Sequence, residues 1–187
     1  MSERKQQILQ AAIDIIVEQG YGALTMRALA RADGIKLGAL QYHFKTRDDM
    51  LRALVGYIAD AYQKRLDEMA TDIDSLGIEG LLEVVGAEPA EGELQVNKLW
   101  PQLWAMGQIE PLVADLVDEI YDKYLQILEQ KIEAAGGESP RAEAIGIMSM
   151  VEGSILFLSE DKRWHKDAGA VNEILLGYIK AKYGANA

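Results

Sequence analysis

The sequence of 187 residues contains no cysteine and only two histidines, His43 and His165. Without cysteine, disulfides and thiolate chemistry are excluded, and the composition is typical of the reducing cytoplasm, which is the location we expect. With so few histidines, a metal site would have to be built from carboxylates, and no carboxylate spacing indicates one. We therefore expect no metal site.

Enzyme and membrane signatures are missing as well. The chain has no G-x-S-x-G, no P-loop and no G-x-G-x-x-G, so we expect no catalytic residues, no cofactor and no enzyme activity. It has no run of about 18 apolar residues, so no membrane partner is expected. The first expected helix carries Asp14 and Glu18, which no secretory signal would contain.

What the sequence does contain is helical periodicity. Hydrophobic residues make up 49% of the chain and recur at helical spacing, with no alternating strand pattern. The predicted fold is all-α, with about nine helices, at residues 4–19, 25–33, 36–44, 47–70, 74–87, 94–107, 111–135, 140–159 and 170–182. Capping signals support two of the starts: Thr46 with Asp49, and Ser139-Pro140 with Glu143. Residues 88–92 are expected to form a loop, because they contain Pro89 and Gly92.

Residues 25–50 form the most informative stretch. Thr25 can cap a short helix, and Asp33-Gly34 can end it, because glycine readily takes the left-handed conformation of a sharp exit. A second short helix follows and ends at about Phe44. Two short helices joined by a glycine turn, with a polar and partly basic outer face, predict a helix-turn-helix that binds DNA.

This stretch resembles the N-terminal signature of the TetR family of transcriptional regulators. The likeness extends from Gly20-Tyr21-Gly22 through Thr25 to Phe44-Lys45-Thr46-Arg47-Asp48-Asp49-Met50-Leu51, and covers roughly residues 4–55. It departs from the family at Lys36, where a capping serine is common, and at Gln41, where an aromatic residue is usual. The resemblance implies a DNA-binding head at 1–46 and an effector-binding, dimerising body at 47–187.

The resemblance also carries roles onto single positions. The positions expected to meet base edges in the major groove are Lys36, Leu37, Gly38 and Gln41. Those expected to contact phosphate are Thr25, Arg27, Tyr42, His43, Lys45 and Arg47. Lys36 can donate to guanine, and Gln41 can pair with adenine. The alternative role for Tyr42, His43 and Phe44 is to pack the helix pair, which we favour for Phe44, whereas for Tyr42 and Lys45 we favour phosphate contact.

The charge distribution agrees with a head that faces phosphate. The net charge is −11, which alone argues against a nucleic-acid partner. Residues 1–52, however, hold eight Lys and Arg against six Asp and Glu, a net of +2, while the remainder carries −13. This asymmetry is the one expected when only one end of the chain meets DNA, although so small an excess could also be ordinary solvated charge.

Aromatic residues and methionines gather in the body and predict a cavity for a small apolar or aromatic effector, as the resemblance implies. The candidate pocket residues are Tyr57, Tyr62, Trp100, Trp104, Met148 and Glu152. Taken singly, each apolar one can equally be core. Glu152 lies among apolar neighbours, where it can answer a cation or hydroxyl of the ligand or bond across a dimer seam.

A homodimer is expected through the last two helices. Gly146 and Gly153 are seven apart and fall on nearly one face, where small residues let another helix approach closely. The predicted interface residues are Gly146, Gly153, Ile155, Ile174 and Tyr178. The alternative is that these faces of the last two helices are buried within one chain.

The function predicted by these features is repression, by a dimer that occupies a palindromic operator in double-stranded DNA and is released by the effector. Two alternatives remain at this stage. A DNA-binding protein without an effector would share the head but have a body without a cavity. A small helical enzyme that uses carboxylates would need a buried carboxylate cluster.

Overall fold

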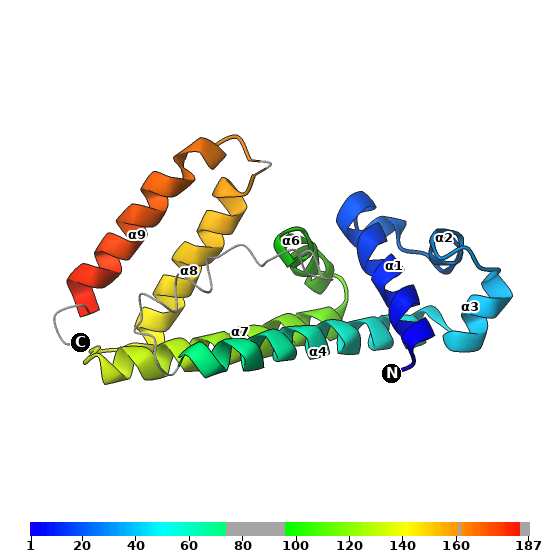
Figure 1. The fold of residues 1–187 in the computed structure, drawn as a ribbon, viewed down its shortest axis with the longest axis horizontal. Coiled ribbons are helices and arrows are strands. Elements are labelled where there is room, and N and C mark those ends of the chain that lie inside the picture. The colour runs from blue at the N-terminus through cyan, green and yellow to red at the C-terminus, as the bar shows by residue number, and fades with distance from the viewer. Residues whose placement is uncertain (74–95, 161, 184–187) are drawn as a thin grey trace. The chain divides into compact units, whose positions relative to one another are not determined.

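The computed structural model describes residues 1–73, 96–160 and 162–183, and is coloured along the chain in Figure 1. These residues form eight α-helices and two short 3-10 helices and contain no β-strand, which confirms the all-α prediction. The helix expected at 74–87 and the loop at 88–92 lie outside the described residues. Packing groups the described residues into two units, one of 1–65 with 96–119 and one of 66–73 with the rest of the chain from 120.

The first unit is built on α1 (Glu3–Gln19), whose apolar side chains lie fully buried along one face. They are Ile8, Leu9, Ala12, Ile13 and Ile16. Gly20 has a φ of 80° and donates its N–H to the Ile16 carbonyl, so the helix ends at a residue that tolerates the left-handed region. The short η1 (Tyr21–Ala23) follows, and α1 packs on η1, α2 and α6.

The helix-turn-helix consists of α2 (Met26–Ala32) and α3 (Leu37–His43). The Thr25 hydroxyl accepts the Ala28 N–H at 3.1 Å, which is the predicted cap. Gly34 has a φ of 68°, and beside it the Ile35 N–H donates to the Ala30 carbonyl at 2.9 Å, which closes the turn. Lys36 stands at the N-cap of α3 without a side-chain cap bond, as the departure from serine predicts.

A long helix, α4 (Arg47–Ile73), leaves the head. Its start has the predicted capping box: Asp49 N–H donates to Thr46 Oγ1 at 3.0 Å, and Thr46 N–H donates to Asp49 Oδ2 at 3.1 Å. Its inner face buries Met50, Leu54 and Ile58. The capping box therefore fixes where α4 begins, and the buried stripe fixes which side of it faces the head core.

The first unit is completed by α6 (Val96–Gly107) and the first turns of α7 (Pro111–Ala134). Between them, the Ile109 and Glu110 N–H groups donate to the Met106 carbonyl at 2.9 and 2.8 Å. A Cβ on Gly107 would lie 3.4 Å from the Ala114 backbone, so glycine permits the close approach of the two helices. The turn between α6 and α7 is therefore tightly bonded.

The second unit contains the end of α7, α8 (Pro140–Leu158), η2 (His165–Asp167) and α9 (Ala168–Tyr183), and Figure 1 shows α8 and α9 side by side. Its core includes Leu128, Ile132, Ala144, Ile147, Met148, Val151, Ile179 and Tyr183. At the start of α8 the Ser139 side chain makes no cap bond, contrary to expectation. Instead the Glu143 carboxylate accepts the Ser139 N–H at 3.0 Å.

Candidate nucleic-acid interface and effector site

The outward face of α3 presents polar side chains over a buried apolar base. Leu40 and Phe44 point into the head core, at 0% and 2% exposure, so Phe44 packs the helix pair as favoured. Of the four residues expected at base edges, Lys36, Gly38 and Gln41 are exposed and Leu37 is half-buried. A Cβ on Gly38 would meet nothing within 4 Å, so the surface at this position is open.

The residues expected at phosphate flank this face. Thr25, Arg27, Tyr42 and Lys45 are exposed, while His43 is half-buried and its ring lies edge-on to Tyr42 at 5.6 Å. Tyr42 is 87% exposed, so it contributes little to the packing of the helix pair. An exposed ring with a terminal hydroxyl beside basic side chains is suited to a partner outside the chain.

Two cations of α1, Arg4 and Lys5, contact other residues of the head. Arg4 bonds to Asp33, whose side chain is 8% exposed, and thereby ties the start of α1 to the end of α2. Lys5 Nζ lies 5.5 Å from the centroid of the Phe44 ring, within reach of a cation–π contact. Both contacts brace the helix pair against α1.

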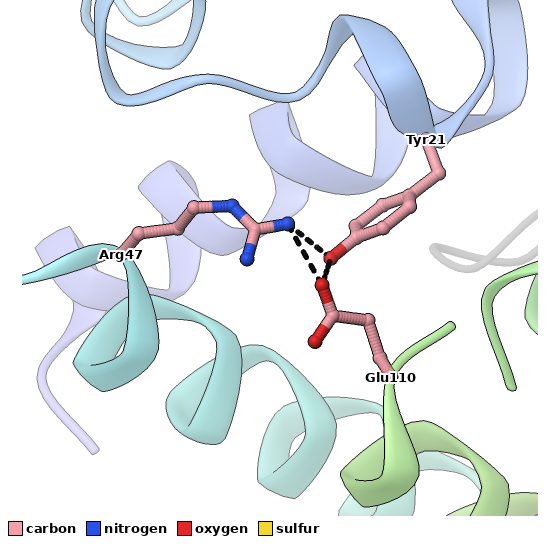
Figure 2. A network of polar contacts seen from close by, with 3 residues as sticks. All are labelled: Tyr21, Arg47 and Glu110. Atoms are coloured by element: carbon pink, nitrogen blue, oxygen red, sulfur yellow. Dashed lines mark hydrogen bonds and ion pairs between the residues drawn. The ribbon is translucent and has the colours of Figure 1, made fainter.

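Arg47, the remaining phosphate candidate, takes part in a network that the sequence did not predict (Figure 2). Its guanidinium donates to the Tyr21 hydroxyl and, at 3.0 Å, to Glu110 Oε1, while the Tyr21 hydroxyl donates to the same carboxylate oxygen. The three residues come from η1, the start of α4 and the turn before α7. Arg47 is 26 and 63 positions from its two partners, so no local pattern indicated the network.

The candidate effector residues divide between the two units. In the first, Tyr62 of α4 and Trp100 of α6 have ring centroids 5.3 Å apart, and Trp104 follows at 6.5 Å from Trp100. Tyr57, also on α4, is half-buried and donates to Gln10 at 3.5 Å. The structure thus brings three predicted aromatic residues, distant in sequence, into one cluster.

The other two candidates, Met148 and Glu152, lie on α8 in the second unit. Met148 is 6% exposed within the core of α7, α8 and α9, and Glu152 is half-buried. Met148 therefore contributes to the packing of its own unit.

The predicted dimer residues lie on the outer side of α8 and α9. Ile174 and Tyr178 are 72% and 50% exposed, and Ile155 is half-buried. A Cβ on Gly146 or Gly153 would meet nothing within 4 Å, so the described residues leave these positions uncovered. Gly146 and Tyr178 also line an open hollow of about 260 Å³ between the two helices.

At one end of the α8–α9 pair, Glu143 gathers three donors. It accepts bonds from the Tyr183 hydroxyl and the Ser139 N–H and pairs with Lys182 at 3.2 Å. The bond from Tyr183, followed by those from Ser139 and Lys182, lowers the pKa of Glu143 to about 2. Burial and the bond to Glu143 raise the pKa of Tyr183 to about 12. This cluster joins the start of α8 to the end of α9.

Within residues 1–73, 96–160 and 162–183, no group of three or more His, Cys, Asp or Glu is placed to hold a metal ion. None of the helices in these ranges has the length and apolar character needed to cross a bilayer.

Comparison with known proteins connects the head to a family. Residues 8–54 match the family described as bacterial regulatory proteins, tetR family. The chain is 24% identical over 160 residues to the HTH-type transcriptional regulator BetI of Klebsiella pneumoniae, a match that covers 80% of this chain and 79% of BetI.

Solved structures share the fold along nearly the whole chain. A transcriptional regulator from Saccharomonospora viridis in complex with choline superposes with a TM-score of 0.77 at 20% identity, over 96% of this chain and 97% of that one. The multidrug binding protein EbrR complexed with malachite green gives a TM-score of 0.68 at 20% identity, over 93% and 96%. The matched segment and the relatives along most of the chain support a DNA-binding transcriptional regulator of the TetR family, and the solved structures show its fold.

Proposed function

We propose that the chain is a repressor whose dimer occupies a two-fold symmetric operator and leaves it when a small effector binds the body. The observation that carries the proposal is the outward face of α3, where exposed polar side chains surround Tyr42, itself 87% exposed. A helix that is buried on one side and polar on the other has the form needed to enter a major groove. In functional terms the head is residues 1–46 and the body is residues 47–187.

Within the head, Lys36, Leu37, Gly38 and Gln41 read base edges. Lys36 is exposed, so its ammonium can donate to guanine O6 or N7, and Gln41 can pair with adenine. Gly38 lets the backbone approach the groove, since it adds no side chain to the open surface. Thr25, Arg27, Tyr42, His43, Lys45 and Arg47 contact phosphate and set the register of the head on the duplex.

The dimer forms through α8 and α9. Large apolar side chains stand on this surface at considerable exposure: Ile145, Met150, Leu156, Phe157, Ile174 and Tyr178. Their exposure in a single chain is consistent with a face that a second copy covers. Gly146 and Gly153 allow the partner helix to come close, because their Cβ positions are empty. Two heads on one dimer match the two halves of a palindromic operator.

The effector binds beside the Tyr62, Trp100 and Trp104 cluster, and Tyr57 is the other aromatic candidate on α4. Three aromatic rings in a row, each close to the next, favour a flat aromatic compound or a compact organic cation, which ring faces attract. The similar structures support these classes, since one contains choline and the other malachite green. Met148 and Glu152, on α8 in the second unit, stay separate candidates for effector contact.

The test of operator binding is selection of genomic fragments by the purified chain, followed by footprinting. We expect a protected palindrome upstream of a gene whose expression rises when the regulator is deleted. Recovery of fragments without a shared palindrome would refute the proposal. Loss of expression on deletion would instead show that the regulator is an activator.

The effector is tested with choline and malachite green as probes. The variant Trp164→Phe removes the exposed third tryptophan, so that the remaining fluorescence reports on Trp100 and Trp104. We expect one of the probes to quench this fluorescence and to lower operator affinity over the same concentration range. A probe that quenches the tryptophans and leaves operator affinity unchanged would favour the alternative of a DNA-binding protein without an effector.

A further inference from the structure

Three side chains from separate segments of the first unit meet at one oxygen of the Glu110 carboxylate (Figure 2). Arg47 donates to Glu110 Oε1 at 3.0 Å and to the Tyr21 hydroxyl, and Tyr21 donates to the same oxygen. The guanidinium carbon also lies 5.3 Å from the centroid of the Tyr21 ring. The network therefore holds Arg47 against the turn between α6 and α7 by an ion pair and an aromatic ring.

The protonation states keep this network charged at neutral pH. The hydrogen bond from Tyr21, reinforced by Arg47, holds the pKa of Glu110 below its usual range. Burial and the bond to Glu110 raise the pKa of Tyr21 to about 12. Glu110 is thus a carboxylate and Tyr21 a neutral hydroxyl at any pH near 7, and the positive charge of Arg47 is balanced by an adjacent negative one.

The backbone of Glu110 is fixed between two helices. Its N–H donates to the Met106 carbonyl at the end of α6, and its carbonyl accepts the Val113 and Ala114 N–H groups in the first turn of α7. A displacement of α6, which carries Trp100 and Trp104, must therefore carry the Glu110 backbone with it. The side chain that neutralises Arg47 is attached to the helix that carries the aromatic cluster.

Arg47 itself remains accessible from outside. Its side chain is 42% exposed, and it occupies the first position of α4, three residues after the buried Phe44. On the proposed function it is one of the cations that contact operator phosphate. The same guanidinium therefore faces two anions, the Glu110 carboxylate within the chain and a phosphate of the duplex, and full attraction to one reduces attraction to the other.

We propose that Glu110 is an intramolecular competitor of operator phosphate for Arg47, so that the turn between α6 and α7 sets the strength of operator binding. This inference rests on the proposed function, because it requires an operator that the head binds. Glu110 would then affect the affinity for DNA without contacting the DNA itself. It also gives the position of α6 a direct electrostatic effect on the head.

The experiment measures operator affinity against KCl concentration for the full chain and for four variants. Glu110→Gln removes the charge and keeps the size of the side chain. Asp115→Asn is the matched control, because Asp115 is an exposed acid in the first turns of α7, shortly after Glu110, and its loss changes the net charge equally. The third variant combines Glu110→Gln with Arg47→Gln, and is compared with Arg47→Gln alone.

We expect Glu110→Gln to bind the operator about two- to fivefold more tightly for each head, the range typical of an exposed ion pair. The plot of log affinity against log salt should steepen by up to about 0.9 for each head, because Arg47 neutralises phosphate more fully when Glu110 no longer competes for it. Asp115→Asn should leave the slope unchanged. In the Arg47→Gln background the gain from Glu110→Gln should disappear, since the two residues act as one pair.

The outcomes that overturn the inference are distinct. A slope for Glu110→Gln equal to that of Asp115→Asn would mean that Arg47 gains no phosphate contact. Weaker binding by Glu110→Gln would show that the pair positions the head instead of competing with DNA. A gain that persists without Arg47 would locate the effect elsewhere. If the unsubstituted chain binds no palindromic duplex, the proposed function fails first and the inference with it.

Discussion

Two exposed surfaces of this chain differ in chemistry. The outward face of α3 carries the exposed side chains of Lys36, Gln41 and Tyr42, while Leu40 on the inner face of the same helix is fully buried. The outward face of α8 and α9 carries Ile174 and Phe157 at 72% and 52% exposure, beside two glycines with open Cβ positions. A polar surface can stand in water without a partner, whereas an apolar one of this kind indicates that another surface covers it.

The difference between the two surfaces predicts opposite responses to salt. Contacts from α3 and its flanks to phosphate release counterions, so added KCl weakens them. Burial of apolar side chains on α8 and α9 involves little charge and is strengthened by salts such as sulfate. The two proposed interactions can therefore be separated by the choice of salt.

The largest expected effect comes from placing a charge on the apolar surface. Ile174→Glu should leave the single chain folded, because the residue is 72% exposed, but would bury an unpaired carboxylate in the dimer. We expect dimerisation to weaken by at least about 100-fold, roughly 2.7 kcal/mol, and operator binding to fall with it. Sedimentation equilibrium measures the association. Asn172→Glu, on an exposed position of the same helix, is the control, and an equal loss there would contradict the assignment.

The next effect concerns base reading by α3. Gln41→Ala should cost roughly 1–3 kcal/mol at a single base pair of each half-site and relax the preference there. The measurement is operator affinity across duplexes that carry each base at each position. A uniform loss over all positions would show that Gln41 contributes to affinity without reading sequence.

A smaller effect is expected at the edge of the same face. Lys45→Ala should weaken binding to all duplexes about equally and flatten the log–log salt slope by about 0.9 for each head. Titrations at several KCl concentrations measure the slope. Lys45 would have no phosphate contact if its removal left the slope unaltered.

The smallest effect concerns the polar cluster that joins α8 to α9. The pKa of Glu143 is about 2 in the folded chain and 4.5 ordinarily, so its stabilisation is complete above about pH 4.5 and is lost as the pH falls toward 2. Glu143→Gln should unfold at lower urea concentration at pH 7 and lose less stability between pH 4.5 and pH 2. The exposed Glu138→Gln is the control, and an identical acid profile for Glu143→Gln and the unsubstituted chain would argue against the cluster.

Local signals predicted the head well. The capping and turn residues bond only to neighbours within about four positions, so their roles can be predicted from the sequence. The structure confirms these roles for Thr25, for Thr46 with Asp49, and for Gly34. The helical periodicity also predicted the all-α fold. Ser139 shows the limit of such signals: Pro140 and Glu143 follow it as expected, yet Glu143 supplies the bond and the serine hydroxyl does not.

Contacts between distant segments were not predictable in the same way. The Tyr21–Arg47–Glu110 network joins residues whose sequence neighbourhoods carry no shared period, and their segments meet only in the folded chain. The aromatic cluster was predicted as a set of residue types, but the pairing of Tyr62 with Trp100 required the fold. The roles of these residues in binding remain predictions.

The most direct test of the account varies the spacing between the two half-sites of the selected operator. A dimer that presents two α3 helices to one face of the duplex needs half-site centres about 34–36 Å apart, or a whole number of turns. Inserting about half a turn, roughly 5 base pairs, should abolish cooperative binding because one head then faces the wrong side. Affinity that is unchanged by this insertion would contradict the claim that two heads of one dimer read the operator together.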